Sequence, residues 1–209
     1  MIKILTSLLL GFYLISSPID YKGYSVGDKA IDFKLKNVDG TNVSMAANVN
    51  NKGYIIIFTC NTCPYSVAYE DRIIELHNKF SSLGYPVIAI NPNDPIVQPG
   101  DSFKKMQQRA REKSFPFPYV LDSTQEITLA YGVTNTPQVY VVERFEDDYI
   151  VRYIGAIDNN TRDANLATKK YVEDAVNGLL SGTSIATTLT KAIGCTIKWS
   201  AASKEKRVN

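Results

Sequence analysis

Two cysteines, Cys60 and Cys63, are the side chains in this sequence best placed to do chemistry. They follow a strand-like apolar run at residues 54–58, and an amphipathic helix pattern begins directly after them. The first backbone N–H groups of a helix have no partner within the helix, and the positive end of its dipole favours negative charge. Because the thiolate is the nucleophile of disulfide exchange, a cysteine in such a place is reactive. The pattern predicts a dithiol redox site.

The spacing of the pair predicts a division of roles. Two intervening residues allow the two sulfurs to approach bonding distance at a helix start. We expect Cys60 to be the exposed nucleophile, and Cys63, one turn deeper, to be the resolving thiol. Pro64 stiffens the first turn because its φ is fixed and its missing N–H would be unpaired there anyway. We expect Asn61, Thr62 and Pro64 to border the substrate.

Other interpretations of the pair remain open. A structural zinc site needs two more Cys or His ligands, and the chain offers only Cys195 and His77. A static disulfide is a further alternative, although so short a loop would stabilise the fold only weakly. The pair could also belong to a non-catalytic module that binds copper or another metal. The dithiol interpretation needs no metal and no organic cofactor.

A second motif, Thr136-Pro137, opens the apolar strand 139–142. An X–Pro bond can be cis at small cost, and cis prolines occur mostly in tight turns. If this turn faces the dithiol, the backbone of Thr136 could pair with an extended substrate segment. The alternative is an ordinary trans proline at the start of an edge strand.

The third cysteine, Cys195, makes the cysteine count odd, which does not fit a fully paired structural framework in an oxidising compartment. It is either a small buried apolar residue beside Trp199 or a third redox thiol that receives the disulfide.

The two ends of the chain differ from the rest. Lys3, an apolar run at 4–15 and Ser16-Ser17 are typical of a secretory signal peptide, so residues 1–17 predict export to a periplasmic or extracellular compartment. An uncleaved anchor or a buried first strand are the alternatives. The apolar run is short for a membrane span, and we expect none in the mature form. Residues 200–209 are expected to be a flexible tail.

The bulk composition indicates one globular domain over residues 25–199. The net charge of +2 is spread along the chain, and no nucleic-acid-binding signature accompanies it, so nucleic acid is excluded as a partner. A loosely alternating segment at 25–45 with an Asp39-Gly40 turn predicts a β-hairpin. The remaining pattern predicts a three-layer α/β/α arrangement with a mixed central sheet. Its expected strands are 53–58, 86–90, 119–121, 138–143 and 149–157, and its expected helices are 64–82, 102–113, 125–131 and 166–180.

The motifs together resemble the thioredoxin fold, and within it the redoxin or peroxiredoxin-like group. The resemblance implies that Pro137 is the cis-proline and that the chain has dithiol–disulfide activity. It extends over residues 25–199 and is carried by the segments 58–65, 68–72, 90–94, 115–119, 155–160 and 193–199.

Three positions depart from that group. Asn135 stands where many relatives have a cysteine, and Tyr54 stands where thioredoxins have a buried acid, so that Glu70, Asp71 or water would have to carry the proton. The peroxidase pattern is Pro-x-x-x-Thr-x-x-Cys. When its cysteine is aligned with Cys63, its Thr falls on Cys60 and its Pro falls on Ile56, so neither residue matches.

The leading hypothesis is therefore an exported thiol–disulfide oxidoreductase. Its substrate would be a disulfide-containing protein or a small thiol compound, and an electron-donating partner would reduce the pair again. Peroxide reduction is the alternative within the same fold, and metal binding by the Cys-x-x-Cys pair is the alternative in another class.

Overall fold

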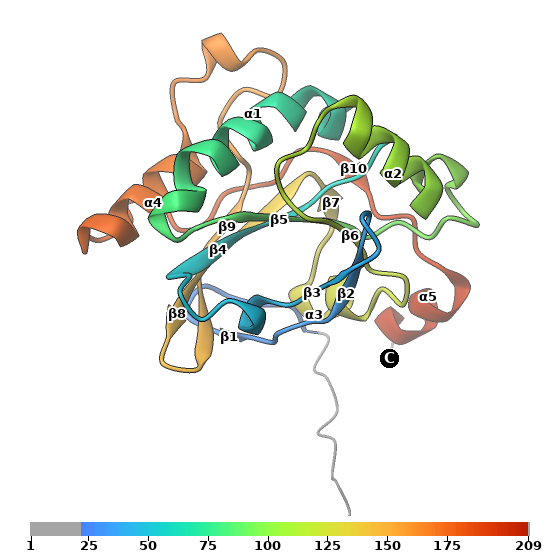
Figure 1. Ribbon diagram of the computed structural model, residues 1–209, viewed down its shortest axis with the longest axis horizontal. Helices are drawn as coiled ribbons and strands as arrows, with labels where there is room; N and C mark the ends of the chain where they lie inside the picture. The colour runs from blue at the N-terminus through green and yellow to red at the C-terminus, as the bar shows by residue number, and fades with distance from the viewer. Residues whose placement is uncertain (1–21, 209) are drawn as a thin grey trace, which may run out of the picture.

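The computed structural model describes residues 22–208, so the expected signal peptide at residues 1–17 lies outside the described residues. The described chain forms one eight-stranded mixed sheet, in the order β1-β9-β8-β4-β5-β6-β2-β3, with helices on both faces (Figure 1). A small second sheet pairs β10 with β7. Among the described helices, none is long and apolar enough to cross a membrane.

The centre of the sheet is built from β4, β5 and β6, which run parallel because helical connections join them. Antiparallel β8 and β9 continue the sheet beyond β4. The bounds of these strands are Gly53–Phe58 (β4), Val87–Asn91 (β5), Tyr119–Leu121 (β6), Gln138–Phe145 (β8) and Asp148–Gly155 (β9).

Short strands close the edges of the sheet. β1 (Lys29–Ala30) pairs with β9, and β2 (Leu35–Asn37) pairs with both β6 and β3 (Asn42–Val43). The β2–β3 pair turns at Asp39-Gly40, which confirms the predicted N-terminal hairpin.

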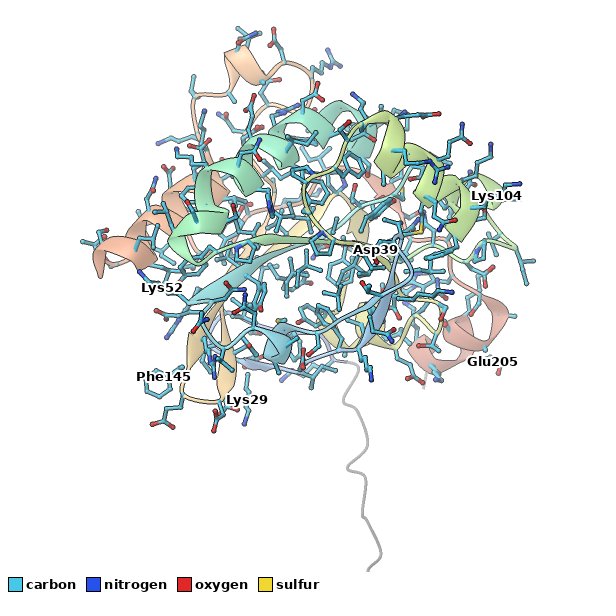
Figure 2. All side chains as sticks on the ribbon, in the orientation of Figure 1. Lys29, Asp39, Lys52, Lys104, Phe145 and Glu205 are labelled. Atoms are coloured by element: carbon cyan, nitrogen blue, oxygen red, sulfur yellow. The ribbon has the colours of Figure 1, made fainter. Side chains whose placement is uncertain are left out.

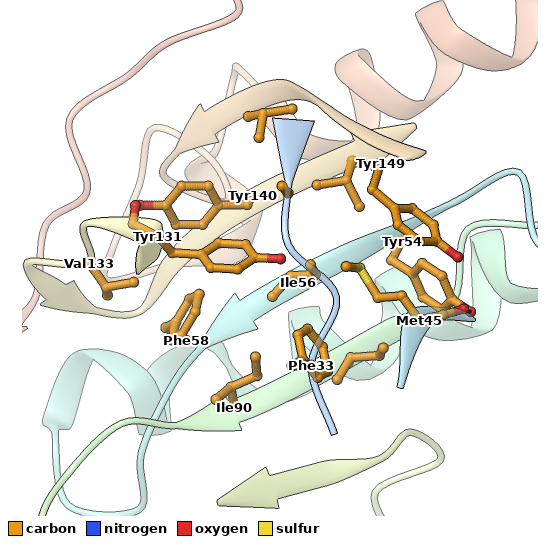
Figure 3. Close-up of a cluster of buried hydrophobic side chains, with 14 of the residues drawn as sticks. Phe33, Met45, Tyr54, Ile56, Phe58, Ile90, Tyr131, Val133, Tyr140 and Tyr149 are labelled. Atoms are coloured by element: carbon orange, nitrogen blue, oxygen red, sulfur yellow. Dashed lines mark hydrogen bonds between the residues drawn. The ribbon is translucent and has the colours of Figure 1, made fainter. Parts of the chain in front are cut away.

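Every residue of β4 is buried, because its alternating side chains enter two separate cores. Ile55 and Ile57 enter the first core, which lies between the sheet and three helices: α1 (Pro64–Phe80), α2 (Phe103–Glu112) and α4 (Tyr171–Ser181). Ile56 and Phe58 pack into the second core, where Figure 3 shows them close to Tyr131 and Tyr140. α3 (Glu126–Tyr131) and α5 (Ala201–Val208) lie on this second side (Figure 1).

The predicted three-layer arrangement with a mixed sheet is confirmed, and two helical predictions change. The last predicted helix begins at Tyr171 rather than at 166, after a short 3-10 turn at Ala164–Leu166. Residues 201–208 form α5 and not a flexible tail. The guanidinium of Arg207 lies over the Trp199 ring, and Lys206 pairs with Glu126, so tertiary contacts order a segment that reads as charged and solvated.

Charged side chains such as Lys52, Lys104 and Glu205 project from the rim of the molecule (Figure 2). Phe145 is likewise exposed, at the tip of the β8–β9 hairpin.

Candidate active site

The two paired cysteines lie at the carboxyl end of β4, where the backbone N–H of Thr59 still bonds to Ile90 of β5. Helix α1 begins at Pro64, and Cys63 is its N-cap residue with extended backbone angles. Cys60 therefore lies in the loop before the helix, and the expectation that both thiols belong to the first turn is wrong. Pro64 occupies the first helical position, as expected for a residue that lacks an N–H.

Both sulfur-bearing residues are buried. The exposed fraction is 3% for Cys60 and 2% for Cys63, so Cys60 is not the exposed thiol of the pair. Cys60 lines a small internal cavity together with Glu70 and Tyr119. All three cysteines of the chain are free thiols.

Thr136 connects the pair to the proline turn. The Thr136–Pro137 peptide bond is cis. The Sγ of Cys60 lies 3.3 Å from the Thr136 hydroxyl, and the Sγ of Cys63 donates to the Thr136 carbonyl oxygen over 3.2 Å. Thr136 thus contacts both sulfurs, and the turn that contains Pro137 faces the cysteine pair.

The third cysteine arrives at the same place. Cys195 lies on β10 (Cys195–Thr196), which pairs antiparallel with β7 (Asn135–Thr136) so that Cys195 is directly opposite Thr136. The side chain and backbone of Cys195 lie close enough to Cys63 to lower the pKa of its thiol. Cys195 is partly exposed, unlike the other two cysteines. The site therefore contains three thiols, not two.

The electrostatics assign the negative charge to Cys63. Hydrogen bonds from the Cys60 thiol, from Cys195 and from the backbone of Ser66 in the first turn lower the pKa of Cys63 to about 4, against the cost of burial. The helix N-terminus acts in the same sense. The Thr136 carbonyl oxygen opposes this effect, because it accepts a hydrogen bond only from the protonated thiol.

Cys60 behaves in the opposite way. Its hydrogen bond to Cys63, its burial and the nearby Asp101 all raise the pKa of Cys60, so it stays protonated and acts as the donor of the pair. Burial, followed by the interaction with Cys63, raises the pKa of Cys195 to about 11. The three pKa shifts together describe one thiolate, that of Cys63, flanked by the protonated thiols of Cys60 and Cys195.

Asp101 holds the loop between the two cysteines. Its fully buried carboxylate accepts hydrogen bonds from the Asn61 backbone N–H (2.8 Å), the Thr62 hydroxyl (2.9 Å) and the Asn93 side chain (2.7 Å). Asn61 also donates to the Gly100 carbonyl. The polar groups of Asn61 and Thr62 are thus bonded within the protein, although Thr62, like Pro64, is exposed.

The acids considered as proton carriers are held by cations. Glu70 accepts two hydrogen bonds from Arg109, at 2.7 and 2.6 Å, and the exposed Asp71 pairs with Lys113. At the position of the missing acid, Tyr54 donates to the Met45 carbonyl oxygen.

A pocket of about 270 Å³ opens beside the cis-proline. It is lined by Tyr69, Pro137, Ile157, Asp158, Thr190 and Ile193 among others. Tyr69 donates to Asp158, which also pairs with Arg72, so the floor of the pocket is fixed. Within residues 22–208, no group of three His, Cys, Asp or Glu residues is placed to hold a metal ion.

The chain is similar to several known proteins. Residues 26–154 match the model of the AhpC/TSA family. An uncharacterized conserved protein from Geobacillus kaustophilus has a similar structure, with a TM-score of 0.77 and 33% identity over 86% of this chain and 95% of that one.

A curated relative, the thiol-disulfide oxidoreductase ResA of Geobacillus thermodenitrificans, is 23% identical over 57% of this chain, and the match spans 64% of the relative's own length. A thiol:disulfide interchange protein of the thioredoxin family from Chlorobium tepidum is 18% identical, with a TM-score of 0.51 over 63% of this chain and 87% of that one. The latter likeness shows the thioredoxin fold alone.

Proposed function

Because the chain belongs to the AhpC/TSA family, we propose that it is a thiol–disulfide oxidoreductase whose redox pair is Cys60 and Cys63. The observation that carries the proposal is the contact of both sulfurs with Thr136, next to a helix N-terminus and a cis-proline turn. The name of the ResA relative supports the same class of reaction.

In the proposed reaction the roles of the two cysteines are exchanged relative to the expectation from spacing. The Cys63 thiolate attacks one sulfur of the substrate disulfide, which forms a Cys63–substrate bond, breaks the substrate S–S bond and releases one substrate thiolate. Cys60 supplies no charge at this stage, because its raised pKa keeps it protonated.

The second step closes the pair. Once the Cys63 sulfur is bonded to substrate, its negative charge no longer raises the pKa of Cys60. Cys60 then loses its proton and attacks the Cys63 sulfur, which forms the Cys60–Cys63 disulfide and releases the second substrate thiol. Two electrons and the Cys60 proton leave the pair, the substrate thiolate released first takes its proton from water, and an external thiol donor must reduce the pair again.

The substrate class we propose is a protein or small-molecule disulfide that enters through the pocket beside Pro137. Export, which we also propose, is supported only by the apolar pattern of residues 1–17. Fractionation of cells that produce the full chain tests it, and recovery of the unprocessed protein from the cytoplasm alone would contradict it.

Trapping of the mixed disulfide tests the mechanism. The Cys60→Ser/Cys195→Ala variant should accumulate a covalent adduct between Cys63 and one insulin chain, because neither neighbouring thiol is present to resolve it. The Cys63→Ser variant should form little adduct and should not reduce insulin. The reverse result would return the nucleophile to Cys60, and full insulin reduction by both variants would remove the proposal.

A second candidate, hydroperoxide reduction, is favoured by the lowered pKa of Cys63 at a helix N-cap in this family. Attack of the thiolate on a peroxide would give a sulfenic acid on Cys63, with water or an alcohol as the product. Dimedone labelling of Cys63 in the Cys60→Ser variant under mild peroxide, with peroxide consumption in the wild type, would promote this reaction over disulfide exchange.

A further inference from the structure

We propose that Cys195 is a third redox thiol, delivered to Cys63 by a C-terminal strand that occupies the place of a bound substrate. The proposal rests on the Cys60–Cys63 pair of the proposed function and adds a separate step to it. Its main observation is the pairing of β10 with β7, in which Cys195 lies opposite Thr136 (Figure 1).

The pairing takes up the backbone that a substrate was expected to use. An extended peptide is often recognised by adding a strand to an exposed edge, and Thr136 provides the edge beside the dithiol. Here residues 194–196 of the same chain fill that edge. A Cβ on Gly194 would lie 2.0 Å from the Thr136 carbonyl oxygen, so the approach of the two backbones depends on glycine at this position.

Further contacts fix the strand in this position. The Asp94 backbone N–H donates to the Lys198 carbonyl oxygen (2.9 Å), and the Lys198 N–H donates to the Asn93 side chain (2.9 Å). Trp199 is buried in the second core. Asn93 also donates to Asp101, so one polar network holds both the loop of the cysteine pair and the strand that carries Cys195.

The three thiols differ in their exposure to solvent. Cys60 and Cys63 are almost completely buried, whereas Cys195 is partly exposed and lies directly opposite Thr136, whose carbonyl oxygen contacts the Cys63 sulfur. A bulky electron donor can therefore reach Cys195 more easily than it can reach the disulfide of the pair. The geometry indicates that Cys195 transfers the disulfide from the interior to the surface.

The step is a balanced exchange. The deprotonated Cys195 sulfur attacks the Cys63 sulfur of the Cys60–Cys63 disulfide, forms a Cys63–Cys195 bond and releases Cys60, which takes up a proton. One thiol of a dithiol donor then attacks the Cys195 sulfur and expels Cys63 as a thiolate. The second donor thiol attacks the first donor sulfur, forms the donor disulfide and releases Cys195. Because a thiol of low pKa is a good leaving group, the lowered pKa of Cys63 favours this second attack.

Disulfide mapping of the full chain tests the link directly. The Cys60→Ser variant, oxidised with diamide and digested without reduction, should yield mainly a peptide pair joined through Cys63 and Cys195. Adding Gly194→Ala should reduce that yield severalfold, because the added Cβ displaces the strand. The Cys60→Ser/Cys195→Ala variant is the control and should give no such pair.

A kinetic comparison separates this proposal from the proposed function. Pre-reduced Cys195→Ser protein should still reduce one equivalent of insulin disulfide in a single turnover, because that step uses only the two electrons of the Cys60–Cys63 pair. Its turnover with a protein dithiol donor should fall roughly tenfold, because the donor must reach the buried pair.

The possible failures are distinct. If the Cys60→Ser variant keeps its native near-ultraviolet circular dichroism and forms no Cys63–Cys195 link, the third thiol is refuted while the dithiol mechanism stands. Wild-type turnover in the Cys195→Ser variant would refute it as well. Loss of single-turnover reduction in the wild type itself would instead refute the proposed function.

Discussion

The Sγ of Cys63 lies 3.2 Å from the carbonyl oxygen of Thr136, the residue that precedes the cis-proline. Thr136 also contacts Cys60 through its hydroxyl and pairs with the strand of Cys195 through its backbone. Three thiols from two segments far apart in the sequence therefore meet around one residue. The predictions below follow from this arrangement and from the groups that hold it in place.

The pKa of Cys63 should depend on the hydrogen bond that Cys60 donates, since that bond is the largest cause of its lowering. Replacing Cys60 with Ala should raise the Cys63 pKa, and Cys60→Ser should raise it less because the hydroxyl can still donate. Thiolate absorbance at 240 nm, followed against pH, measures this value, with Cys63→Ser as the blank. An unchanged pKa in the alanine variant would contradict the assignment.

Folding stability should rise with pH because of Cys63. The lowered pKa means that, between about pH 4 and the ordinary thiol value near 9, Cys63 binds fewer protons in the folded protein than in the unfolded chain. The stabilisation is therefore complete above the unfolded pKa and is lost as the pH falls through the folded pKa.

Urea unfolding of the reduced wild type and of the Cys63→Ser variant at several values between pH 5 and 8 measures this effect. The difference in the free energy of unfolding should grow with pH, by at most about 1.4 kcal/mol per pH unit for one proton. Parallel pH dependences of the two proteins would show that Cys63 is not a thiolate in the folded state.

Asp101 should act as a positioning residue for the loop of the cysteine pair. Asp101→Asn leaves a side chain of equal size but replaces one acceptor oxygen by a donor, which disrupts the bonds to Thr62 and Asn93. We expect the free energy of unfolding to fall by about 1–3 kcal/mol.

The reduction potential of the pair should shift in the same variant, which a merely structural role would not require. Asp71→Asn is the matched control, because Asp71 is an exposed acid on α1 and should change stability by less than about 0.5 kcal/mol. Equal effects of the two substitutions would argue against the role of Asp101.

The pocket floor beside Pro137 depends on the ion pair between Arg72 and Asp158, whose side chains are 10% and 5% exposed. Arg72→Ala leaves the Asp158 carboxylate buried without its cation and should cost about 3–5 kcal/mol. Lys79→Ala, which breaks the more exposed pair with Glu173, should cost at most about 1 kcal/mol. Thermal or urea unfolding compares the two, and a smaller loss for Arg72→Ala than for Lys79→Ala would be the contrary result.

Local patterns in the sequence were sufficient for most of the fold. The apolar run that forms β4 and the turn at Asp39-Gly40 each depend on neighbouring residues, and each lies where its pattern predicts. Helix α5 escaped prediction because Arg207 and Lys206 are held by Trp199 and Glu126, contacts that no local pattern contains.

The sequence identified the cysteine pair of the site but not which of the two cysteines carries the negative charge. The spacing of Cys60 and Cys63 identified the pair, yet the start of α1 at Pro64 decides which sulfur receives the helix amides. Asp101 and Cys195 reach the site only through tertiary contacts, over distances of about 40 and 130 residues along the chain. No motif marked Asp101, whereas the odd cysteine count and the resemblance carried by residues 193–199 both pointed to Cys195.

A redox titration of the wild type against a thiol buffer, with alkylation and mass mapping at each potential, examines the central claim most directly. The account predicts a reversible two-electron transition in which Cys60 and Cys63 lose and regain their thiols together. If the two cysteines stay fully alkylatable after denaturation at every potential, or react independently, the dithiol mechanism is wrong.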